Sequence, residues 1–107
     1  MNECKDIASA LETAVRLLSP TKVYLFSVKT GEGDGCVTDF DLGVVTPLIQ
    51  NDGDRLALTK QVYFALDTDI PFDLFLYSPS EWDALTKDEA SFASRIKRKG
   101  RLLYENQ

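Results

Sequence analysis

The chain has 107 residues, a length that suits one domain (1–107) built around one hydrophobic core. Its hydrophobic fraction of 44% and charged fraction of 27% are those of an ordinary globular protein. The net charge of -5 argues against a surface that binds duplex nucleic acid, although it leaves room for a local nucleotide site.

The sequence shows no feature that directs a protein into or across a membrane. No apolar stretch approaches the roughly 20 residues that a membrane-spanning helix needs. The segment from Met1 to Asp6 lacks the basic start and apolar run of a signal peptide. Cys4 and Cys36 have no metal or redox spacing, so we expect two free thiols in a cytoplasmic protein.

Histidine is absent from the chain. This absence excludes nucleophilic catalysis through a Ser–His or Cys–His pair, and it excludes every metal site with an imidazole ligand. Carboxylates therefore remain as the groups that are able to carry chemistry.

The first half of the chain predicts a helix followed by two strands. Ile7, Leu11, Val15 and Leu18 fall at helical spacing, and Ser19-Pro20 ends that helix. The residues from 23 to 28 and from 40 to 45 are rich in β-branched and aromatic residues, which is typical of strands. Between them, residues 29–38 form a predicted loop with Gly31, Gly33 and Gly35, which matches neither a Walker A loop nor a dinucleotide fingerprint.

The second half predicts a helix, a strand and two further helices. A turn with a helix cap at 51–54 precedes a helix over 56–66, and residues 72–77 form the third strand. Capping-box spacing predicts helix starts at Ser78 and at Thr86, with Trp82 as a core residue. The basic run 97–101 suits a helix C-terminus, and a contact to phosphate or to an acidic partner is the alternative interpretation. Residues 102–104 add a short strand or dock on the body.

Three aspartates are the candidate site residues. Asp39 and Asp41 are two apart in a strand, so they share one face while Phe40 and Leu42 point into the core. Two adjacent carboxylates repel each other, and a hard cation with oxygen ligands relieves that repulsion. Asp73 opens the third strand and supplies a third carboxylate. The alternative interpretation is a set of solvated charges at a strand edge.

This arrangement resembles the signature of the DNA polymerase β-like nucleotidyltransferase superfamily, and within it the minimal nucleotidyltransferases. In that family an apolar strand ends in Gly-Ser, a loop follows, and then Asp-apolar-Asp-apolar precedes a third carboxylate on a later strand. Here Asp39 to Leu42 fits the pair, Asp73 fits the third position, and Phe26 stands thirteen residues before Asp39. The segments 77–82 and 100–105 also resemble the family, so the likeness spans nearly the whole chain.

The resemblance implies an α/β (α+β) fold, with a small mixed sheet and helices mainly on one face. It implies that Asp39, Asp41 and Asp73 are catalytic and bind two Mg²⁺ ions, with ATP as the expected substrate. Asp73 would also help to deprotonate the attacking hydroxyl. The expected acceptor is a hydroxyl on a HEPN-domain partner protein, with this chain as the antitoxin of a toxin–antitoxin pair and part of a homo- or hetero-oligomer.

The chain departs from the family at the Gly-Ser motif, where it has Ser27-Val28. Together with Lys29, these residues stand at the nucleotide-binding positions. Ser27 adds a Cβ where the backbone approaches the triphosphate, and Val28 lacks the hydroxyl that binds a phosphate. A hydrogen bond to a charged group contributes roughly 1.5–3 kcal/mol, so its loss would weaken binding on the order of 10- to 100-fold. The second hypothesis is therefore a catalytically degenerate binding partner that keeps the fold.

Overall fold

Four strands form one mixed sheet in the order β3-β2-β1-β4. The computed structural model describes residues 5–31, 37–66 and 70–106, so Cys4, Gly33, Gly35 and Cys36 lie outside the described part. Antiparallel pairs join β1 to β2 and β1 to β4, and a parallel pair joins β2 to β3. The predicted α/β class with a mixed sheet is confirmed. The strands are β1 (Lys22–Thr30), β2 (Val37–Val45), β3 (Phe72–Tyr77) and β4 (Arg101–Glu105).

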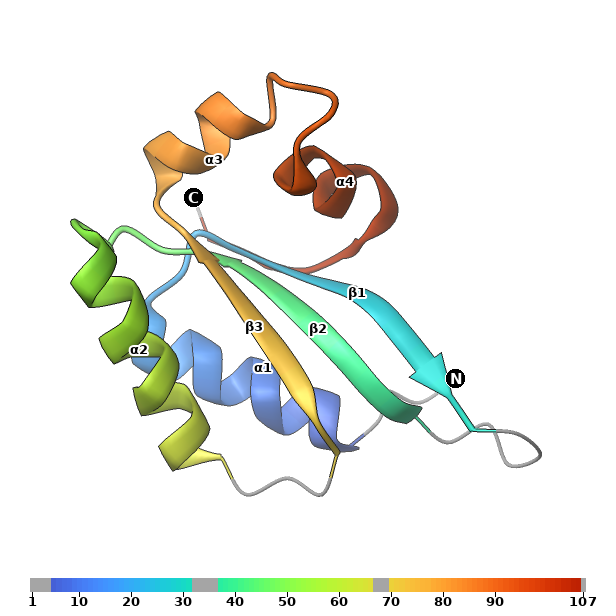
Figure 1. Cartoon of the computed structure of the whole chain (residues 1–107). Coiled ribbons are helices and arrows are strands. Elements are labelled where there is room, and N and C mark those ends of the chain that lie inside the picture. The colour runs from blue at the N-terminus through green and yellow to red at the C-terminus, as the bar shows by residue number, and fades with distance from the viewer. Residues whose placement is uncertain (1–4, 32–36, 67–69, 107) are drawn as a thin grey trace.

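Helices lie on both faces of the sheet, two on each (Figure 1). The longer pair, α1 (Lys5–Leu18) and α2 (Asp52–Ala65), covers one face, whereas the sequence predicted helices mainly on a single face. The shorter pair, α3 (Pro79–Leu85) and α4 (Phe92–Lys99), covers part of the opposite face. No helix within the described ranges is both long and apolar enough to cross a membrane.

The core between α1 and the sheet depends on small residues at the helix centre. Ala10 and Ala14 are fully buried, whereas Leu11, which the helical spacing placed on the buried face, is only partly buried. An alanine brings the helix backbone close to the sheet, so the larger side chain moves to the margin of the contact. Ile7 and Leu18 are buried as predicted.

The opposite core is mainly aromatic. Trp82 is 3% exposed and its ring lies 5.3 Å from the ring centroids of both Tyr24 and Tyr77, so its predicted core position is confirmed. Ile96 packs over Gly43, where an added Cβ would meet the Ile96 side chain at 3.2 Å. The lack of a side chain at Gly43 therefore allows α4 to approach β2.

Some element boundaries differ from the sequence-based expectation. The first two strands run to Thr30 and from Val37, so the predicted 29–38 loop is shorter than expected. The last helix begins after Ser91, whose hydroxyl accepts from the Ser94 backbone N–H, and not at Thr86. Capping-box spacing alone cannot identify the N-cap residue, because several Ser and Thr side chains in this segment are able to hydrogen-bond to nearby backbone groups.

Two side chains of α2 cover the outer edge of β3. The Tyr63 hydroxyl donates to the Phe72 carbonyl at 2.9 Å, and the Arg55 guanidinium donates to the Leu76 carbonyl. Burial and then the negative charge of Asp73 raise the pKa of Tyr63, while a hydrogen bond from the Leu74 backbone partly offsets that rise. An edge strand with unpaired backbone groups can pair with another chain, so these contacts block β3 from doing so.

We expect Tyr63→Phe to lower the free energy of unfolding by about 1 kcal/mol, because a hydrogen bond to the strand edge is lost. Urea denaturation measures the loss, and light scattering reports any association through the opened edge. Tyr104→Phe is the matched control, since no hydrogen bond of its hydroxyl is present among the described residues. Equal losses in both variants would contradict a specific role for Tyr63.

Candidate functional site

Three aspartates lie on the sheet face that carries α3 and α4. Asp39 and Asp41 alternate along β2 with the fully buried Phe40 and Leu42, which point to the opposite face. In the parallel pair, Asp41 is the register partner of Asp73. The structure therefore brings the three predicted carboxylates onto one face of two adjacent strands.

This proximity affects the ionisation of Asp41, whose pKa is raised above its ordinary value. Burial is the largest cause, followed by the negative charge of Asp73, with a smaller effect of Asp39. A hydrogen bond from the Asp73 backbone and the positive charge of Lys29 each lower the pKa in part. The net rise means that the site disfavours ionised Asp41, and a bound cation would reverse that preference.

The three carboxylates fit a magnesium site in their chemistry. Carboxylate oxygens suit Mg²⁺, which keeps several waters and needs only one or two protein carboxylates beside substrate phosphates. Within residues 5–31, 37–66 and 70–106, no three His, Cys, Asp or Glu side chains are grouped closely enough to hold a metal ion. Binding would therefore have to draw the partly exposed Asp39 and Asp41 and the exposed Asp73 together.

The three predicted nucleotide-binding residues, Ser27, Val28 and Lys29, are exposed near the end of β1. Lys29 is the register partner of Asp39, so it lies in a strand and not in the predicted loop. Ser27 has a φ of 54°, in the left-handed region that favours glycine, and the pairing of β1 with β2 shifts register just after Phe26. Ser27, which stands where the resembled motif has glycine, thus has a backbone conformation that is typical of glycine.

The register shift also changes which side chains share a surface. Phe26 and Ser27 are adjacent in the chain, yet both line a cavity of about 390 Å³ with Phe92, Arg95 and Lys99 of α4. A regular strand would point them to opposite faces, and a bulge at a left-handed residue removes that alternation. Sequence reasoning gave Arg95 no role, because nothing local to it indicates that α4 returns to β1.

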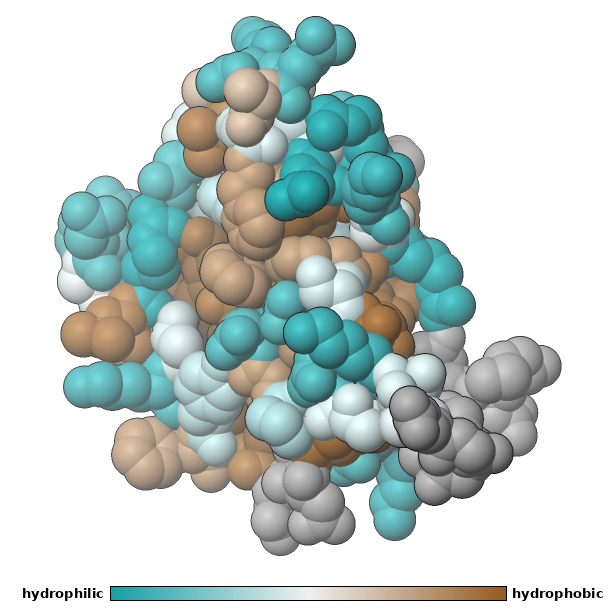
Figure 2. Space-filling view, turned by 45° about the vertical axis from the view of Figure 1, so that its right-hand side comes forward, coloured by the Kyte–Doolittle hydropathy of each residue, from teal (hydrophilic) through white to brown (hydrophobic). Residues whose placement is uncertain are grey.

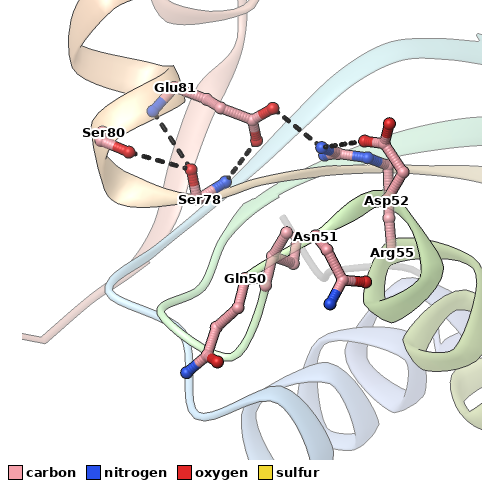
Figure 3. Close-up of a pocket in the computed structure, with 8 residues that line it drawn as sticks. Gln50, Asn51, Asp52, Arg55, Ser78, Ser80 and Glu81 are labelled. Carbon is pink, nitrogen blue, oxygen red and sulfur yellow. Dashed lines mark hydrogen bonds and ion pairs between the residues drawn. The ribbon is translucent and has the colours of Figure 1, made fainter.

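A second cavity, of about 540 Å³, lies beyond the carboxyl ends of β2 and β3 (Figure 3). The three candidate aspartates do not line it. Arg55 binds Glu81 at 2.8 Å and Asp52 at 3.4 Å across it. Glu81 also accepts from the Ser78 backbone N–H, which completes the predicted capping box. The hydrogen bond from Arg55 is the largest cause that lowers the pKa of Glu81. These groups satisfy one another's charges and hydrogen bonds. We therefore interpret the residues around this cavity as a structural contact between α2 and α3.

Comparisons with known proteins bear on the fold. No protein-family model matches the chain, and no curated protein matches it. Among solved structures the chain is similar to one described as "Crystal structure of putative nucleotidyltransferase", with a TM-score of 0.58 and 19% sequence identity. That match covers 92% of this chain and 97% of the other. The fold is nucleotidyltransferase-like. At this level of identity the likeness concerns the fold alone.

We expect Asp41→Asn to raise the free energy of unfolding of this nucleotidyltransferase-like domain at neutral pH. The folded-state pKa of Asp41 is raised, so its contribution to stability falls as pH rises from the unfolded pKa through the folded pKa, and stays low above it. The gain of the asparagine variant should therefore vanish at acid pH, where Asp41 is protonated in both states. Thermal unfolding across pH measures this difference.

The control for that experiment is Asp83→Asn, which changes an exposed carboxylate on α3. Its free energy of unfolding should stay within about 0.5 kcal/mol of the parent protein at every pH. Destabilisation by Asp41→Asn at neutral pH would show that the Asp41 carboxylate is not repelled in the folded state.

We also expect Ser27→Gly to stabilise the fold by roughly 0.5–1 kcal/mol. A left-handed conformation costs a residue with a Cβ roughly 1–2 kcal/mol, so removing the Cβ stabilises the folded state. The greater backbone entropy of glycine in the unfolded chain offsets part of that stabilisation. Val28→Gly is the matched control and should destabilise, because Ser27 and not Val28 has a positive φ. Denaturation midpoints that move in the same direction for both variants would contradict this account.

Proposed function

We propose that the chain is a metal-dependent nucleotidyltransferase that transfers AMP from ATP to a hydroxyl of a partner protein. The observation that carries this proposal is the placement of Asp41 beside Asp73, with Asp39 two residues away, on a nucleotidyltransferase-like fold. Burial and then the negative charge of Asp73 raise the pKa of Asp41, and a bound cation would stabilise the ionised carboxylate.

In this reaction Asp39, Asp41 and Asp73 would hold Mg²⁺. The bound metal supplies charge stabilisation for the phosphate oxygens and orients the nucleotide. A bond forms between the acceptor oxygen and the α-phosphorus, and the bond from that phosphorus to the leaving pyrophosphate breaks. Asp73, which is exposed, would accept the proton of the attacking hydroxyl, so the proton would pass to this chain.

In this proposal the acceptor hydroxyl belongs to another protein. Exposed apolar side chains on α2 support a protein partner, since such residues are usually covered by an interface. Phe64 is 88% exposed and Leu56 is 59% exposed. Figure 2 shows further apolar side chains gathered in the middle of one face, bordered by hydrophilic ones. A HEPN-domain protein, paired with this chain as its antitoxin, is the partner we propose.

The test incubates the protein with Mg²⁺, the proposed partner and ATP labelled at either the α- or the γ-phosphate. Transfer of AMP places the α-label and not the γ-label on the partner. Asp41→Asn should reduce the labelling rate on the order of a hundredfold or more, since charge stabilisation in the transition state is lost. Asp83→Asn should label at the parent rate. No transfer by the parent protein, or equal transfer by Asp41→Asn, would overturn the proposal.

A second candidate function is a non-catalytic binding partner that keeps the fold. The observation that favours it is Val28, which is 42% exposed and has no hydroxyl where the resembled motif has serine. A tight complex with the partner, unchanged by Asp41→Asn and free of label, would support this alternative over transfer.

A further inference from the structure

The cavity between β1 and α4 combines positive charge with aromatic walls. Its volume is about 390 Å³, and it is lined by Phe26, Ser27, Phe92, Arg95 and Lys99. Arg95 and Lys99 are four residues apart on α4, so their side chains project from one side of the helix. Both cations therefore border the same cavity.

Among residues 5–31, 37–66 and 70–106, no acidic side chain forms an ion pair with Arg95 or Lys99. In the part of the protein that the structure describes, the ion pairs belong to Arg55, which binds Glu81 and Asp52. Arg98, from the same helix, donates to the carbonyl of Glu89 at 3.2 Å. Neither Arg95 nor Lys99 has an acidic partner among these residues, and both are exposed. Two unneutralised cations at one cavity attract an anion even in a protein whose net charge is -5.

An aromatic cluster lies beside this cavity, because Phe26 and Phe92 both line it. The rings of Phe26, Phe75 and Phe92 lie with their centroids 5.1–5.7 Å apart. Phe26 is the register partner of Asp41, and it also lines the cavity. Phe26 therefore links the cavity that the two cations line to the strand position of Asp41.

We propose that Arg95 and Lys99 bind the terminal phosphates of a nucleoside triphosphate, with Ser27 on the opposite side of the cavity. This inference rests on the proposed function, because it orients the nucleotide whose α-phosphate would lie at the aspartates. A polyphosphate carries several negative charges and many acceptor oxygens, which match a guanidinium, an ammonium and a serine hydroxyl. The basic residues of α4 thereby supply phosphate contacts that Val28 cannot make.

The test measures binding of inorganic tripolyphosphate without metal, by calorimetry at low ionic strength. We expect Arg95→Gln and Lys99→Gln each to weaken binding by about tenfold or more, since each removes a charge-assisted hydrogen bond. Lys97→Gln is the matched control. It removes the same charge from the last turn of the same helix, at a residue that does not line the cavity. The control should change the affinity by less than about twofold, because exposed charges outside the site are screened.

Equal weakening by Lys97→Gln and Lys99→Gln would overturn the proposal, since it would show diffuse attraction to a basic helix end. Absence of tripolyphosphate binding to the parent protein would also overturn it. Asp83→Asn, measured in parallel, should bind tripolyphosphate as the parent does, because Asp83 is exposed on α3 and does not line the cavity. Failure of AMP transfer with intact tripolyphosphate binding would count against the proposed transferase reaction and not against this site. Circular dichroism of each variant confirms that α4 is retained.

Discussion

The parallel pairing of β2 with β3 is the constraint on which the candidate site depends. Phe40 and Phe72 are register partners on the buried face, and their rings stack 5.2 Å apart at an interplanar angle of 7°. The same register places Asp41 opposite Asp73 on the other face. A slip of one residue would bury the aspartates and expose the phenylalanines, so the hydrophobic core itself keeps the carboxylates on one face of the sheet.

Among the described residues, the aspartates form no ion pair with Arg95 or Lys99. Asp41 is the register partner of Phe26, which lines the same cavity as Arg95 and Lys99. Burial and then the negative charge of Asp73 raise the pKa of Asp41, so its ionised form is disfavoured. By contrast, Arg55 and Glu81 satisfy each other at the far end of the sheet. This difference in ion pairing separates the candidate site from the structural cavity.

The backbone conformation of Ser27 brings the end of β1 to the cavity that α4 also lines. The left-handed conformation of Ser27, with the register shift in β1, aims it at the same cavity as Phe26. Such a conformation persists in a residue with a Cβ only when the surrounding structure enforces it. Here the sheet pairing before and after the shift does so, and the shift directly follows Phe26, the register partner of Asp41.

The sequence by itself determined the local features of this protein. Strand alternation placed Asp39 and Asp41 on one face, and the Ser78 capping box marked a helix start, because each depends on residues only a few positions apart. Only the tertiary structure decided that α4 returns to β1, so that Arg95 meets Ser27, and that short helices cover the second face. Those arrangements follow from how the two cores pack across distant segments, and local periodicity carries no information about that packing.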